Sequence, residues 1–380
     1  MGTTNSTARG PGLDTLRDGL APHQAAQDAH ADEQNTPPAE QEESTVSVDS
    51  SCSAELDSQP EPVEAEEAVV APPVIAAGAL TASLRALGDL PEATGWRKLL
   101  RLGPSKTQLQ AAERKARLLV GFPGSVSITA VSVKGGAGKT PTMRGVMAAL
   151  ANARGGGVGM VDMNELRGTA LLRSVVSHDR HIGDLLGNIE YLLGRHAQIS
   201  ELEWCMNRQP DSSEWVLASD PETTAAISWD DFTKLHTVLK RFYSIVGFDT
   251  GNAELSVSWR ASVRAADAYV VPMKWRADHV EPAVKMLETM LERDTSVQTR
   301  TIIVGTNNVG ESDPLARQLA KEHFTRLGLP IQEIPIDPGL NQQVIRWNSL
   351  KPATQVAFEE LAAELLVKAT TTAQQKGTDR

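Results

Sequence analysis

Residues Val126–Thr140 read V-S-I-T-A-V-S-V-K-G-G-A-G-K-T, an apolar run that leads directly into a glycine-rich loop. The glycines let backbone N–H groups converge on phosphate oxygens, and a helical pattern from about residue 140 adds the positive end of a helix dipole. In such a loop the lysine reaches the terminal phosphates, the threonine hydroxyl holds Mg²⁺, and proline fits the first helical turn. We therefore predict that nucleotide phosphates are bound by Lys134, Gly135, Gly136, Ala137, Gly138, Lys139, Thr140 and Pro141.

Short apolar runs alternate with helical patterns along the rest of the chain. The helical patterns are clearest at residues 229–241, 279–292 and 314–327. Because the strands are too apolar to leave one face in water, we predict an α/β fold with a mostly parallel, doubly wound sheet and helices on both faces. This domain spans residues 123–370 and is followed by a flexible tail, residues 371–380. The predicted strands are residues 126–133, 158–162, 215–218, 244–249, 268–273, 301–305 and 331–336.

The charge of the chain is concentrated in its first 94 residues. They hold three arginines, no lysine and seventeen acidic residues, a net charge of −14, whereas the remainder has 34 basic and 31 acidic groups, a net charge of +3. They also contain nine prolines and no aromatic residue, so they cannot bury enough apolar surface to offset the entropy lost on folding. We predict a disordered acidic tail at residues 1–94. The acidic total therefore does not exclude binding of a polyanion by the remainder.

A basic, partly amphipathic segment at residues 95–122 connects this tail to the domain. Its basic residues outnumber the single acid Glu113, and apolar residues are interleaved among them. One interpretation is a helix that packs its apolar side on the domain, and the other is binding to DNA, anionic lipid or a partner.

The cysteine count and the hydropathy restrict the class of protein further. Cys52 and Cys205 are too few for a disulfide framework or a four-cysteine zinc site. No run of about 18 apolar residues is long enough to span a membrane, and residues 1–21 lack the apolar block of a signal peptide. We expect a cytoplasmic protein.

The order Lys-Gly-Gly-x-Gly-Lys-Thr, opened by Lys134, resembles the deviant Walker A motif of the ParA/MinD family of ATPases. Residues 158–164 resemble that family's second strand and first switch, residues 244–250 its Walker B strand, and residues 334–338 the loop that closes over the base. The resemblance extends over residues 126–366. It implies a P-loop NTPase fold, ATP and Mg²⁺ as ligands, and an ATP-dependent homodimer in which Lys134 reaches the partner's phosphates, although a surface lysine at a strand end is the alternative.

The resemblance also assigns candidate site residues. It implies that Asp249, with Thr140, holds Mg²⁺, although a carboxylate at a strand end can also cap a turn. Asp162 matches the first-switch aspartate, and Asn164 replaces the aspartate that places the attacking water, so we expect slow hydrolysis. Asn307 is the candidate adenine-reading residue, with a turn-forming asparagine as the alternative. The catalytic set is Lys134, Lys139, Asp162 and Asn164, and Gly251 and Asn252 replace two prolines of the second switch.

Three functions fit these features. The first is a partition ATPase that binds DNA nonspecifically, associates with the nucleoid and is stimulated by a centromere-binding protein. The second is a MinD-like accessory ATPase of type VII secretion, and the third is a nucleotide-binding scaffold with little hydrolysis. Stable membrane binding is not expected, because the predicted last helix, residues 353–368, carries Glu359, Glu360 and Glu364, which repel an anionic bilayer.

Overall fold

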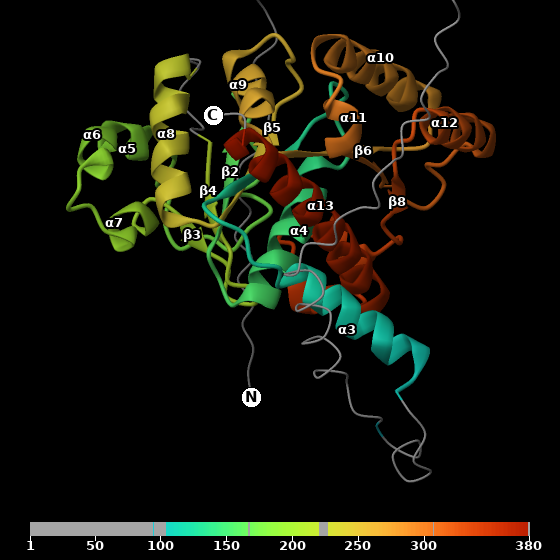
Figure 1. The fold of residues 1–380 in the computed structure, drawn as a ribbon, viewed down its shortest axis with the longest axis horizontal. Helices are drawn as coiled ribbons and strands as arrows, with labels where there is room; N and C mark the ends of the chain where they lie inside the picture. The colour runs from blue at the N-terminus through green and yellow to red at the C-terminus, as the bar shows by residue number, and fades with distance from the viewer. Residues whose placement is uncertain (1–93, 95–103, 166–167, 220–226, 307, 379–380) are drawn as a thin grey trace, which may run out of the picture. The chain divides into compact units, whose positions relative to one another are not determined.

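The computed structural model describes residue Thr94 and residues 104–165, 168–219, 227–306 and 308–378 (Figure 1). Its eight-stranded sheet has the order β3-β4-β2-β5-β1-β6-β7-β8, and every pair is parallel except β3 with β4. This confirms the predicted α/β fold with a mostly parallel sheet. The strands are β1 (Val126–Ala130), β2 (Val158–Met163), β3 (Asn207–Arg208), β4 (Trp215–Leu217), β5 (Ile245–Thr250), β6 (Ala268–Met273), β7 (Thr301–Gly305) and β8 (Ile331–Glu333).

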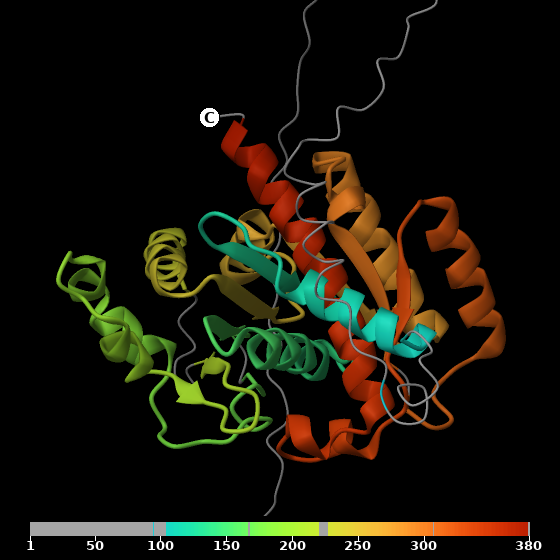
Figure 2. The same ribbon diagram turned by 60° about the horizontal axis from the view of Figure 1, so that its bottom comes forward.

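Alternation along β6 shows how the sheet buries both faces. Ala268 and Val270 join the cluster formed with α4 (Lys139–Arg154) and α13 (Pro352–Thr378). The residues between and after them, Tyr269, Val271 and Met273, join a second apolar cluster that contains residues of α10 (Ala277–Arg293). Successive side chains of a strand point to opposite faces, so the apolar run itself requires helices on both sides. Figure 2 shows α4 and α13 together on one side of the sheet.

The remaining helices of the domain complete the two layers. The sequence predicted α8 and α12, but it did not predict α5, α6 or α7, which are five or six residues long and too short to show a helical period. It also missed the two-residue strand β3. The helices are α5 (Ile182–Gly187), α6 (Ile189–Leu193), α7 (Ile199–Glu203), α8 (Trp229–Phe242), α9 (Val257–Ala265), α11 (Val297–Arg300) and α12 (Pro314–Arg326), with two 3₁₀ turns, η1 (Pro338–Asn341) and η2 (Trp347–Ser349).

The described part of the basic segment forms α3 (Lys106–Leu118), which packs against α13. Arg114 donates hydrogen bonds to Glu359 (2.8 Å) and Glu360 (3.0 Å), and Arg117 donates to Glu360 (3.0 Å). Two of the three carboxylates that were expected to repel a bilayer, Glu359 and Glu360, therefore bind a basic helix, whereas Glu364 accepts a hydrogen bond from Gln332. Of the two interpretations of this segment, the structure has the helix packed on the domain.

The carboxyl end of the chain differs from the flexible tail predicted from residue 371. Helix α13 continues to Thr378, and Thr370 and Thr372 are buried. Lys376 pairs with Asp267 at 2.8 Å, which attaches the last turns to the start of β6. No helix among the described residues is long and apolar enough to cross a membrane. Apart from Thr94, the predicted acidic tail lies outside the described residues.

Candidate nucleotide-binding site

The glycine-rich loop connects β1 to α4 in a conformation that only glycine adopts easily. Gly136 has a φ of +74° and Gly138 a φ of +90°, both in the left-handed region. A Cβ at Gly138 would lie 2.8 Å from the hydroxyl oxygen of Thr306, so the loop backbone also passes close to the end of β7. No described side chain caps the start of α4. The N–H groups at this helix start are therefore available to bind an anion.

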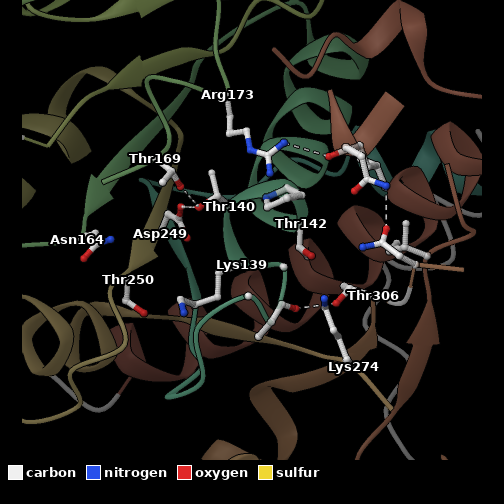
Figure 3. A pocket seen from close by; sticks show the side chains of 18 of the residues that line it. Lys139, Thr140, Thr142, Asn164, Thr169, Arg173, Asp249, Thr250, Lys274 and Thr306 are labelled. Carbon is white, nitrogen blue, oxygen red and sulfur yellow. Dashed lines mark hydrogen bonds between the residues drawn. The ribbon is translucent and has the colours of Figure 1, made fainter. Parts of the chain in front are cut away.

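A cavity of about 460 Å³ opens in front of this loop, at the carboxyl ends of the parallel strands (Figure 3). This is where ligands bind in open α/β sheets. The predicted residues that the cavity brings together are Gly136, Ala137, Gly138, Lys139, Thr140, Pro141, Asp162, Asn164 and Asp249.

Thr140 and Asp249 form the polar centre of the cavity. The hydroxyl of Thr140 donates to Asp249 Oδ2 at 2.6 Å, and Thr169 Oγ1 lies 3.3 Å from the same hydroxyl. Asp249 Oδ1 is buried and has no hydrogen-bond partner among the described residues. A hydroxyl and a carboxylate with a free oxygen are ligands that suit Mg²⁺. The donor set therefore fits a divalent cation.

Burial controls the ionisation of Asp249. Burial, together with the charge of Asp162, raises the pKa of this carboxyl to about 7. Asp162 lies opposite Asp249 in the register of β2 and β5. The Thr140 hydrogen bond and the charge of Lys139 oppose this rise. A bound cation would favour the ionised form of Asp249, so binding of a metal ion would release a proton from this carboxyl.

Lys139 is held by two oxygen atoms at the edge of the cavity. Its Nζ donates to the carbonyl oxygen of Ser132 at 3.2 Å and to Oδ1 of Asn252. Burial lowers the pKa of the ammonium group, and the charge of Asp249 opposes this effect. The sequence marked Asn252 only as a departure in the second switch, whereas the structure makes it the side-chain partner of Lys139.

Asp162 lies at the end of β2 and Asn164 directly after it, in the segment that the resemblance identified as a first switch. Asp162 is buried, and its two oxygens accept backbone N–H bonds from Asn164 (3.1 Å) and Ala170 (3.0 Å). Burial raises the pKa of Asp162 to about 6, and these bonds oppose the rise. Asn164 lines the cavity, and a Cβ on Gly251 of the second switch would lie 3.0 Å from its Oδ1. Asp162 therefore fixes the backbone of the segment after β2, and Asn164 lies next to Gly251, which follows β5.

Lys134 and Gly135 are not among the residues that line the cavity. Lys134 has 44% of its side chain exposed, and its Nζ lies 3.5 Å from Asp278 Oδ2 at the start of α10. Asp278 also accepts from Arg276 at 2.9 Å. The Lys134 side chain therefore lies on the surface, where it shares the Asp278 carboxylate with Arg276.

The cavity is also lined by Ile334, Pro335 and Leu340 and by an amide pair, in which Asn341 donates to Asn308 Oδ1 at 2.9 Å. Asn307, the predicted adenine-reading residue, lies outside the described residues.

Arg173 also lines the cavity and was missed by sequence reasoning. Its Nη1 donates to the carbonyl oxygen of Leu340 at 3.4 Å (Figure 3) and to that of Gln342 at 2.7 Å. These bonds join the segment after β2 to η1 and the residue that follows it. An isolated arginine in a loop carries no spacing signal. Its position could not be predicted without the fold.

A mostly parallel sheet, a glycine-rich loop between β1 and α4, and a Thr140–Asp249 pair beside that loop are the features of a P-loop NTPase fold. No family model matches the sequence, and a search of curated proteins finds no match.

Among solved structures, the ParA family ATPase from Chlorobium tepidum matches with a TM-score of 0.51 and 18% identity, over 63% of this chain and 98% of that one. The cell division ATPase MinD from Pyrococcus furiosus matches with 19% identity over 63% and 98% of the two chains and a TM-score of 0.48. A Cyanothece McdA complex with ATP gives 16% identity, 64% and 96% coverage and a TM-score of 0.48. The first of these shows that the chain has the ParA/MinD type of fold, as its motifs implied.

Proposed function

We propose that this chain is a ParA-like ATPase in which ATP, bound with Mg²⁺, closes a homodimer and slow hydrolysis opens it. The observation that carries the proposal is the Thr140–Asp249 pair, whose second carboxylate oxygen has no partner among the described residues and which lines the same cavity as the glycine loop with its two left-handed residues. Thr140 would hold Mg²⁺ directly and Asp249 through water, and the ion would neutralise charge on the phosphates.

In this proposal Lys139, Asn164, Asp162 and Lys134 each have a separate role. Lys139 binds the terminal phosphates, and it must leave Asn252 to do so, which frees the second switch. Asn164 orients water through hydrogen bonds but cannot accept a proton, and this accounts for slow turnover. Asp162 keeps the first switch in place through its bonds to the backbone. Lys134, exposed beside the cavity, reaches the partner subunit's phosphates.

Paired lysine variants test this division. Lys139→Ala should abolish binding of a fluorescent ATP analogue in equilibrium titration. Lys134→Ala should bind the analogue normally but stay monomeric in light scattering with ATP, because its side chain lies outside the cavity. Lys274→Ala is a matched control, because Lys274 lines the same cavity but pairs with Glu311 at 2.7 Å. ATP-dependent dimers of Lys134→Ala would refute the cross-subunit role.

We further propose that the dimer positions a cargo on nonspecific DNA in the cytoplasm, with a centromere-binding type of protein stimulating hydrolysis. The net charge of +3 after residue 94 supports this. Arg114 and Arg117 are engaged with α13, so the DNA contacts would fall to other cations such as the exposed Lys106 and Lys115. Anisotropy with random duplex DNA and a nonhydrolysable ATP analogue at two salt concentrations tests this, since phosphate contacts weaken steeply with salt. Absence of binding at low salt would exclude it.

A further inference from the structure

A second cavity, of about 690 Å³, lies apart from the nucleotide site and shares no lining residue with it. It is bounded by α9, by α10 with the α11 that follows it, and by the last turns of α13. These elements gather at one end of the domain in Figure 1. Its apolar lining includes Trp259, Val263, Met286, Met290 and Val297. The cavity is large enough for several apolar side chains of a ligand.

The lining of this cavity has more cations than carboxylates, and three of its arginines form no ion pair with a described residue. Arg260, Arg264 and Arg293 line it and are exposed, and none of them forms an ion pair with another described residue. Two other cations of the lining are paired, Arg300 with Asp294 and Lys376 with Asp267. The three arginines therefore present guanidinium groups that a carboxylate can bind in bidentate fashion.

Trp259 supplies a second, independent indication of a ligand. It is 5% exposed, it lines the cavity, and its indole Nε1 is buried without an acceptor among the described residues. A buried N–H group without an acceptor is unfavourable, and most such groups in proteins have a partner. A carbonyl or carboxylate oxygen of a ligand would satisfy it.

We propose that this cavity is the docking site for an acidic segment of a partner protein that carries apolar side chains. Leu255, 75% exposed, and Trp229, 45% exposed, extend the apolar surface to the edge of the cavity, as expected for a site that a polypeptide covers. Carboxylates pair with Arg260, Arg264 and Arg293, and apolar side chains fill the floor. The backbone of duplex DNA offers the negative charge but nothing apolar to occupy the cavity.

The docking site is linked to the second switch by a short stretch of chain. Asn252 bonds to Lys139, and Glu254 and Leu255, two and three residues later, line the docking cavity. Glu165 of the first switch accepts from the backbone N–H of Ser258 at 3.3 Å, in the first turn of α9. This coupling rests on the proposed function: a segment bound here senses whether Lys139 has released Asn252.

Fluorescence anisotropy of the full chain without nucleotide tests the docking site separately from ATP binding. The probe is a fluorescein-labelled peptide, Glu-Leu-Glu-Glu-Leu-Leu-Glu-Glu, with one control peptide that has serine for each leucine and another that has glutamine for each glutamate. We expect binding of the probe and at least about 10-fold weaker binding of either control. The double variant Arg260→Ala, Arg264→Ala should weaken probe binding by about 10-fold, whereas Arg326→Ala, an exposed arginine on α12, should not change it.

Trp259→Phe keeps an aromatic ring but removes the indole N–H, and it should weaken the probe several-fold while circular dichroism and thermal unfolding confirm that the variants fold. Equal binding of the probe to wild type and the double variant would overturn the proposal. So would full displacement of the probe by random duplex DNA, or arginine-dependent binding to phosphatidylglycerol vesicles with no binding of the probe. Loss of ATP binding would contradict the proposed function but leave this result unaffected.

Discussion

Replacement of Gly138 by alanine tests whether the loop backbone approaches β7 as closely as the structure shows. At this position two obstacles coincide, a φ of +90° and a Cβ position 2.8 Å from Thr306 Oγ1 and 3.0 Å from Thr306 Cβ. Gly136 is the matched control in the same loop. It has a φ of +74°, but nothing lies within 4 Å of its Cβ position.

The geometry sets the size of both effects. Left-handed backbone costs a residue other than glycine about 1–2 kcal/mol, and this penalty applies to both variants. Crowding in a packed environment adds about 1–3 kcal/mol, and it applies to Gly138→Ala alone. We therefore expect Gly136→Ala to lower the free energy of unfolding by about 1–2 kcal/mol and Gly138→Ala by about 2–5 kcal/mol. Gly138→Ala should also weaken nucleotide binding more, because it displaces the start of α4.

Urea unfolding followed by tryptophan fluorescence gives the two free energies, and a double-mutant cycle identifies the cause. Thr306→Ala removes the obstructing hydroxyl, although it also removes the hydrogen bond to the carbonyl oxygen of Ala137 (2.6 Å). The double variant should lose less unfolding free energy than the two single variants lose together, by about 1 kcal/mol. Strict additivity, or equal stability of Gly136→Ala and Gly138→Ala, would refute the close approach.

Three further predictions concern other parts of the molecule. Burial, followed by the charge of Lys240, lowers the pKa of His236 to about 4. As the pH falls below about 6.5, the imidazole is therefore protonated in the unfolded chain before it is protonated in the folded one, and the free energy of unfolding decreases. His236→Gln should reduce that loss between about pH 7 and pH 4.5 by roughly 2 kcal/mol in urea titrations, and an unchanged pH slope would contradict the assignment. Arg114→Ala should lower stability by roughly 1 kcal/mol and speed proteolysis after α3, whereas the exposed control Lys115→Ala should do neither. Asn164→Asp should raise single-turnover hydrolysis about 10-fold, or about 1.4 kcal/mol of barrier, and an unchanged rate would show that water placement is not limiting.

The sequence predicted the central sheet because its signal is local. The bounds of β6 and β7 match their predicted runs, and the glycine loop lies between a strand and a helix as its spacing requires. Short elements such as α7 escaped prediction, since five residues contain too little of a helical period. The end of α13 was also missed, because Thr370 and Thr372 look polar in sequence but pack against the domain.

The candidate site was predictable only where a motif fixes the residue type. Thr140 and Asp249 are 109 positions apart in the sequence, yet the glycine-loop motif predicts the first and the end of an apolar strand predicts the second. The fold brings their oxygens to 2.6 Å. Arg173 and Asn252 reach the same cavity through loops, whose paths depend on contacts made elsewhere. The pairing of Arg114 with α13 could not be predicted for the same reason, because either helix alone shows only a charged face.

The two edge strands of the sheet, β3 and β8, affect whether molecules aggregate at high concentration. The strand β3 has two residues and β8 has three, so neither offers a long row of unpaired backbone groups to another chain. Glu333 on β8 is also surrounded by Arg317, at 2.6 Å, and Lys321, which places charges along that margin. Short, charged margins of this kind prevent sheets of different molecules from joining. At high protein concentration, molecules are therefore not expected to associate by extending one another's sheets through β3 or β8.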